Sequence, residues 1–210
     1  MAILKKAKVI FLVMLVVFVV SFGAGYVSGK LKLANLDKIR TSKLQEFNRN
    51  LEYKVPGYGD LLQKYKNWER PKLFRYILNG KAVKAMFLIF FNNWVVANLT
   101  MVVRAAFLVP LALYPYGRFL QGLTFAQTSI SYQAWGGTLI CEFGGYFLVI
   151  CGTLCALFWT LLYKKFGFPS RKKGLWSGLK FFAVIYLVSG FFILFGSYIE
   201  TMFMIEMSIR

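Results

Sequence analysis

The sequence predicts an all-α protein, a polytopic transmembrane helical bundle of about five spans. Its composition is the first reason, because 58% of the 210 residues are hydrophobic, against roughly 45 to 50% in soluble domains. The second reason is the length of its apolar stretches, since a spanning helix needs roughly 20 mostly apolar residues. Four regions meet that requirement: residues 9–27, 85–130, 134–163 and 175–204.

The region 85–130 is long enough for two spans, which brings the total to five. Pro110, Pro115, Gly117 and Gly122 mark a helix break within this region. A helix broken at membrane depth is tolerated when protein covers it. The alternative is therefore four spans plus a re-entrant hairpin broken at these residues. In both arrangements we expect a multi-pass protein of the cell membrane.

Three blocks of different composition follow one another along the chain. Residues 1–29 combine Lys5, Lys6 and Lys8 with a long apolar run, which indicates a signal-anchor transmembrane helix. Residues 30–84 form a basic amphipathic region, which turn-forming residues at 53–60 divide into helical halves at 33–51 and 61–78. Both halves are expected to lie along the membrane surface. Residues 85–210 form the polytopic bundle.

The net charge of +18 lies mainly in segments that flank apolar spans. Attraction to anionic lipid headgroups, about 1 kcal/mol per basic residue near the surface, accounts for this excess. We expect membrane lipids, including anionic headgroups, and other membrane protein subunits as partners, but no nucleic acid, because no basic and aromatic module of the known kinds is present. The basic loop 164–173 predicts a cytoplasmic location for the connection between the last two spans.

Orientation depends on the number of spans. Five spans, with the amino terminus and the loop 164–173 inside, place the basic region 30–84 outside. The four-span alternative puts both basic regions on one side, which satisfies the positive-inside rule better.

Cysteine and histidine usage excludes several classes of protein. The three cysteines, Cys141, Cys151 and Cys155, all fall within one expected span and form no CxxC pair, so they are read as small packing residues. The chain has no histidine, the commonest metal ligand and neutral-pH proton carrier. We therefore expect no metal, no cofactor and no enzymatic activity.

The informative residues are polar side chains inside the apolar spans. Glu142 lies in an otherwise uncharged stretch, where a carboxylate costs at least ~2.5 kcal/mol. It falls on a face of small residues, as does Glu200, while Asn93, Thr100 and Arg104 share a face if their helix is regular. These faces predict an intramembrane polar cluster: Asn92, Asn93, Asn98, Thr100, Arg104, Glu142 and Glu200. The cluster either holds the bundle together by charge pairing or lines an ion, proton or polar-substrate path.

The order of these features resembles the stage II sporulation protein M family of bacterial and archaeal membrane proteins. The matching segments are 90–98 with its asparagines, 110–122 with its prolines and glycines, the glycine-rich span of Glu142, and 198–201 with Glu200. The chain has Tyr116-Gly117 and Thr138-Leu139 where that family usually has Asn-Gly and His-Gly. The resemblance implies an integral membrane component that acts beside cell-wall-remodelling proteins, or as a scaffold or transport subunit, without catalysis.

Taken together, these features predict a non-catalytic integral membrane subunit or scaffold that assembles with other membrane or envelope proteins. The alternative is a transporter or channel component in which the Glu, Arg and Asn side chains form a polar path.

Overall fold

The computed structural model describes residues 2–35, 58–99, 102, 109–127, 136–137 and 139–209, and every regular element in this part of the chain is helical. Three of the described helices are long and apolar enough to cross a membrane: Ile3–Lys30, Phe143–Leu161 and Arg171–Ser208. A shorter apolar helix covers Ala82–Ala97. The expectation of an all-α fold is therefore confirmed, with three helices long and apolar enough to cross a membrane, while the count of five spans stays a prediction.

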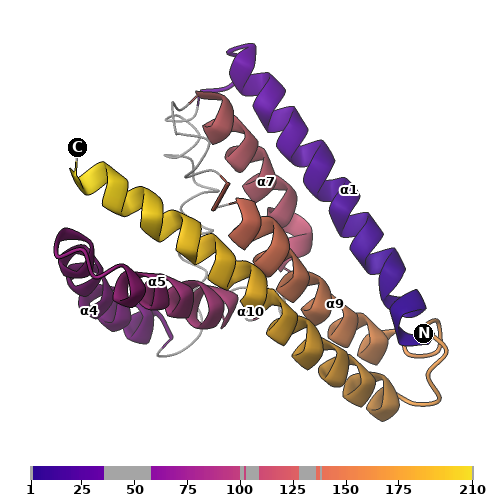
Figure 1. The fold of residues 1–210 in the computed structure, drawn as a ribbon. Coiled ribbons are helices and arrows are strands. Elements are labelled where there is room, and N and C mark those ends of the chain that lie inside the picture. Colours follow the sequence, from indigo (N-terminus) through magenta and orange to yellow (C-terminus); the bar gives the residue numbers. More distant parts are fainter. Residues whose placement is uncertain are drawn as a thin grey trace. The chain divides into compact units, whose positions relative to one another are not determined.

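The helices follow one another as shown in Figure 1: α1 (Ala2–Lys30), α4 (Tyr58–Leu78), α5 (Ala82–Phe91), η2 (Asn92–Ala97), α7 (Val109–Gln127), η3 (Ile140–Tyr146), α9 (Phe147–Leu161) and α10 (Arg171–Ile209). The elements η2 and η3 are π-helical turns, in which each backbone N–H bonds five residues back instead of four. The predicted surface helix at 61–78 lies within α4, whereas the predicted helix at 33–51 lies mostly outside the described residues.

The chain divides into two compact units. Unit 1 comprises Met1–Glu52, Arg104–Ile130 and Thr153–Phe181. Unit 2 comprises Tyr53–Val103, Ser131–Gly152 and Phe182–Arg210. These units interleave along the sequence, so they cut across the blocks 1–29, 30–84 and 85–210 that composition suggests.

In unit 1, α1 and α7 pack side by side and run in the same direction (Figure 1). A Cβ atom at Gly25 would overlap the carbonyl of Phe119, and one at Gly122 would overlap the carbonyl of Phe22. The two backbones therefore touch at these glycines. Gly29, four residues after Gly25, would similarly collide with Ala126, which makes this a small-xxx-small contact of the kind that joins helices in lipid.

The segment from Pro110 to Gly122 is continuous helix, although its prolines and glycines predict a break. Pro110 occupies the first turn of α7, where an N–H has no intrahelical partner in any case. Pro115 lies inside the helix and removes one backbone hydrogen bond without ending it. Nothing lies within 4 Å of a Cβ atom built at Gly117, whereas Gly122 is the contact with α1.

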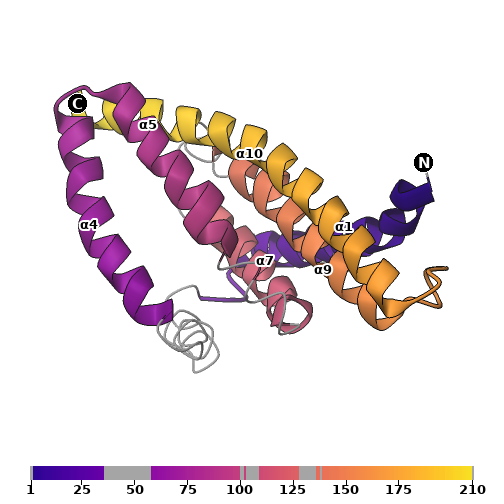
Figure 2. The ribbon, with the colours of Figure 1, turned by 90° about the horizontal axis from the view of Figure 1, so that it is seen from below.

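In unit 2, α4 and α5 form an antiparallel helical hairpin, seen most clearly in Figure 2. Gly80 ends α4 in the left-handed conformation, with a φ of 64°. Its N–H bonds the carbonyl of Ile77, and the next N–H, from Lys81, bonds that of Tyr76. This is the Schellman pattern that closes a helix. The ring of Tyr65, near the start of α4, lies against Phe91 at the end of α5, so the two helices also touch at the end away from the turn.

We expect Gly122→Ala to destabilise the protein, because the added methyl group would push α1 away from α7. Overpacking of this kind costs about 1 to 3 kcal/mol. Gly117→Ala in the same helix is the matched control and should be neutral or stabilising by up to ~1 kcal/mol, since alanine favours helix over glycine. Thermal unfolding of both purified variants in detergent measures the difference. Equal midpoints for the two would contradict the backbone contact.

Candidate functional site

The carboxy-terminal half of α10 buries a stripe of small and hydroxylated residues in unit 2. The stripe comprises Ser189, Gly190, Ile193, Gly196, Ser197 and Thr201. The hydroxyl groups bond within the helix: Ser197 Oγ donates to the Ile193 carbonyl at 2.8 Å and Thr201 Oγ1 to the Ser197 carbonyl at 2.7 Å. The buried hydroxyls are therefore satisfied by their own helix, which leaves this face free to pack closely against another backbone.

The partner of this stripe is the segment that ends in η3. A Cβ atom at Gly137 would lie 3.1 Å from the Gly196 carbonyl, and one at Gly145 would overlap the Ile193 side chain. Between these glycines, the Cys141 Sγ lies 3.7 Å from the Ile193 carbonyl, within hydrogen-bond distance for sulfur. Cys141 thus fills a gap between close backbones, as its small size predicts. In this contact η3 runs antiparallel to α10.

A reciprocal pair of hydrogen bonds joins η2 to α10. The indole N–H of Trp94 donates to the Tyr186 carbonyl at 3.1 Å, and the Tyr186 hydroxyl donates to the Trp94 carbonyl at 2.8 Å. The two rings lie 5.3 Å apart. A Cβ atom at Gly190 would lie 3.0 Å from the indole nitrogen, so glycine at this position lets the indole approach the helix.

The π-helical turn relieves the Trp94 carbonyl of one helical hydrogen bond. In a regular α-helix the N–H of Asn98 would bond the carbonyl of Trp94. Here that N–H bonds the carbonyls of Asn93 and Val95 instead, so the Trp94 carbonyl is available to Tyr186. Local departure from the α-helix therefore creates the acceptor for a contact between two helices.

The three predicted asparagines occupy different environments at this turn. The side chains of Asn92 and Asn93 are half-buried and bond each other, with 3.3 Å between Nδ2 and Oδ1. Asn98 is fully buried, and neither atom of its amide has a hydrogen-bond partner among the described residues. A buried amide without partners costs about 1 to 3 kcal/mol of folding free energy, so Asn98 in this arrangement destabilises the site.

Glu200 lies on α10 directly beside the Gly137 contact. A Cβ atom built at Gly137 would lie 3.3 Å from the backbone nitrogen of Glu200. Glu69, from α4, is a further acidic residue of unit 2, and its side chain is buried. Neither carboxylate forms an ion pair within the described part of the chain.

Glu69 is 93% buried, which the amphipathic pattern of α4 did not predict. Burial raises the pKa of Glu69 above its ordinary value, and the nearby charge of Arg70 offsets part of this rise. The phenol of Tyr65, one helical turn earlier, has its pKa raised to about 12, because it is buried and because the charge of Glu69 lies close by. The site thus contains an acidic residue from the surface helix in addition to those expected from the spans.

The remaining predicted residues are only partly described. Thr100 and Arg104 lie outside the described residues. The backbone of Glu142 is part of η3, but its side chain lies outside the described part of the structure. The structure places Glu200 and Glu69 in unit 2, while the proposed pairing of Arg104, Glu142 and Glu200 remains a prediction.

The described residues contain no group of three or more His, Cys, Asp or Glu side chains arranged to hold a metal ion. Cys141, Cys151 and Cys155 are buried, and none of them forms a disulfide within the described part of the chain.

The long apolar helices and the small-residue contacts between them define a helical membrane protein. Comparison with protein-family models, with curated proteins and with solved structures finds no match to this chain.

Replacing Tyr186 with Phe should remove one of the two hydrogen bonds that join η2 to α10. Such bonds between membrane helices contribute about 0.6 kcal/mol on average, so we expect a loss of stability of that size. Tyr198→Phe is the matched control, because Tyr198 is an exposed tyrosine of the same helix. Unfolding of both variants from mild detergent into SDS gives the two free energies. An equal loss in both would show that the Trp94 contact contributes nothing.

The buried carboxylate of Glu69 predicts a pH dependence of stability. Because its pKa is raised in the folded protein, the folded state holds this proton at pH values where the unfolded state has lost it. The free energy of unfolding should therefore fall as the pH rises from about 4.3, the ordinary pKa of glutamate, through the raised value. Glu69→Gln should remove this part of the slope and stabilise the protein at neutral pH.

Asp60→Asn provides the control for this titration, since Asp60 is an exposed acid at the start of the same helix. Its slope between mildly acidic and neutral pH should match that of the unmodified protein. A Glu69→Gln variant that keeps the full slope would show that another group titrates.

Proposed function

We propose that this protein is a non-catalytic, multi-pass subunit of the cell membrane that assembles with another membrane or envelope protein. The main observation in support of this proposal is the length of α10, which continues without interruption for 39 residues. At 1.5 Å per residue this helix measures about 58 Å, whereas a bilayer is about 40 to 45 Å thick with its headgroups. A typical tilt of about 20° shortens its projection by only a few ångströms.

The end of α10 that extends beyond the hydrocarbon exposes large apolar side chains, among which lie the acids Glu200 and Glu206. If α10 enters the bilayer just after its basic start at Arg171–Lys173, about 20 residues take it across. The following turns expose Tyr198, Met202 and Met207, with Met207 at 61%. Apolar side chains in this position face neither lipid tails nor a described partner, and exposed apolar surface at such a place typically marks a protein contact.

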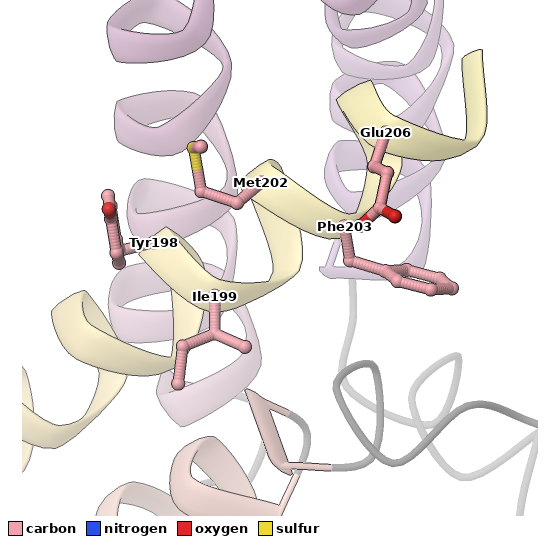
Figure 3. Close-up of a pocket in the computed structure, with 5 residues that line it drawn as sticks. All are labelled: Tyr198, Ile199, Met202, Phe203 and Glu206. Carbon is pink, nitrogen blue, oxygen red and sulfur yellow. The ribbon is translucent and has the colours of Figure 1, made fainter. Parts of the chain in front are cut away.

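A shallow pocket of about 260 Å³ lies on the same end of the helix, lined by Tyr198, Ile199, Met202, Phe203 and Glu206. Figure 3 shows Phe203 beside the carboxylate of Glu206, with Met202 and Tyr198 projecting from α10 toward another side. Methionine side chains adapt to irregular partner surfaces, and aromatic residues anchor them. This surface suits an apolar segment of a partner with one polar group.

The direction of the helices in unit 1 supports a five-span arrangement. Helices α1 and α7 run parallel, so a chain that crosses the bilayer through both in one direction must return once between them. The apolar helix formed by α5 and η2 is the described segment that can make this return. We therefore propose that α5 with η2 and α7 are spans in addition to the three long apolar helices.

The resemblance to the stage II sporulation protein M family agrees with a role as a scaffold beside envelope proteins. Within this proposal the polar side chains of unit 2 hold the bundle together and perform no chemistry. The Trp94 and Tyr186 pair is an example of such a contact, because each side chain bonds the backbone of the other's helix.

Site-directed photo-crosslinking in cells tests the docking surface. A benzophenone side chain in place of Met202 should give a discrete protein adduct that mass spectrometry identifies. The same probe in place of Leu187, which is exposed on the same helix but lies within the expected hydrocarbon depth, should give lipid adducts only. Lipid adducts alone at both positions, with a chain that purifies without partners, would contradict the proposal and favour the transporter alternative.

A further inference from the structure

Two basic segments that are far apart in the sequence meet at one end of unit 1. Lys6, near the start of α1, contacts the connection between α9 and α10: its Nζ lies 3.4 Å from the Gly167 carbonyl and 3.9 Å from the centre of the Phe168 ring. Figure 1 shows the amino terminus near this connection. One lysine therefore joins the two segments.

The connection is held in a defined shape by its own backbone. Gly167 adopts the left-handed conformation with a φ of 68°, and the N–H of Phe168 bonds the carbonyl of Tyr163 at 2.8 Å. These are the marks of a Schellman motif that ends the helix before it. Ser170 then caps α10, because its Oγ accepts a hydrogen bond from the N–H of Lys173 at 3.2 Å.

Positive charge is concentrated at this end of unit 1, and no acidic side chain from the same segments balances it. The exposed basic residues are Lys5, Lys8, Lys164, Lys165, Arg171, Lys172 and Lys173. The segments that carry them, residues 1–30 and 153–181, contain no Asp or Glu. The amino-terminal ends of α1 and α10 also lie here, and the partial positive charge of a helix start attracts anions. The basic side chains and both helix starts thus favour the same kind of ligand.

The surroundings of the charge favour a lipid over a soluble anion. Behind the connection, the buried ring of Trp159 packs against Phe168 at 5.5 Å and against Phe181 at 5.3 Å. Trp176, one turn after the basic start of α10, is 55% exposed. An exposed tryptophan beside lysines at the start of an apolar helix is typical of headgroup depth.

We propose that this basic end, formed by the start of α1, the 162–170 connection and the start of α10, binds the phosphate of an anionic phospholipid. The lysines and Arg171 would contact the headgroup, while the exposed apolar faces of α1 and α10 accept the acyl chains. Lys6 has a positioning role, because its contacts with Gly167 and Phe168 keep the two basic segments together.

The test uses the full chain in detergent, with phosphatidylglycerol as the probe and phosphatidylcholine as the reference lipid. Native mass spectrometry measures how much lipid remains bound at each concentration. Replacing Lys164, Lys165, Lys172 and Lys173 with glutamine should weaken phosphatidylglycerol binding by about tenfold or more, since each basic residue near anionic lipid matters severalfold. Phosphatidylcholine retention should not change.

The matched control removes the same charge from exposed positions of unit 2, with Lys64, Arg75, Lys81 and Lys84 replaced by glutamine. Its loss of binding should be well below that of the first variant. Arginine at positions 164, 165, 172 and 173 should retain binding. If the fourfold glutamine variant does not fold, the pair Lys164→Gln and Lys165→Gln gives the same comparison.

Three results would overturn the proposal. The first is an equal loss of binding in the two glutamine variants, which would indicate that net charge alone matters. The second is equal retention of the two lipids by the unmodified protein. The third is unchanged phosphatidylglycerol binding after the four lysines are replaced. Recovery of an acidic protein on this end in the absence of lipid would likewise replace the lipid with a protein partner.

Discussion

Close approach of helix backbones at glycine is the constraint on which both units depend. Lipid tails are as apolar as leucine, so burial of large side chains does not drive membrane helices together. Packing at short range has to supply the association. In unit 1 this occurs at Gly25 and Gly122, and in unit 2 at Gly137 and Gly145. Many large side chains lie outward as a consequence; Phe191, for example, is 76% exposed.

The composition was sufficient to predict helices and the approximate positions of the three that are long and apolar enough to cross a membrane. The α1 and α7 contact was not recognised, although its signal is present in the sequence as Gly25 and Gly29 at a spacing of four. Two glycines four residues apart show that a helix face permits close packing, but they do not show which other helix packs against that face.

The geometry of the polar site was harder to predict, and the reason is the two π-helical turns. The expected face of Asn93, Thr100 and Arg104 assumes 100° per residue, and η2 interrupts that period from Asn92 onward. Asn98 is the buried amide as a result. Glu69 was assigned to a solvated surface helix because its neighbours are charged, and only the fold of the α4 and α5 hairpin shows that it is buried.

The parallel contact between α1 and α7 also has a consequence for the order of events during synthesis. Ribosomes deliver the amino-terminal segments first, at about 5 to 20 residues per second. Helix α1 therefore enters the bilayer while α7 has not yet been made, and its Gly25 and Gly29 face has no intramolecular partner during that interval. That face must remain uncommitted, or be shielded by the insertion machinery, until the second helix arrives. Correct folding thus requires that α1 does not pack stably against another helix before α7 has been inserted.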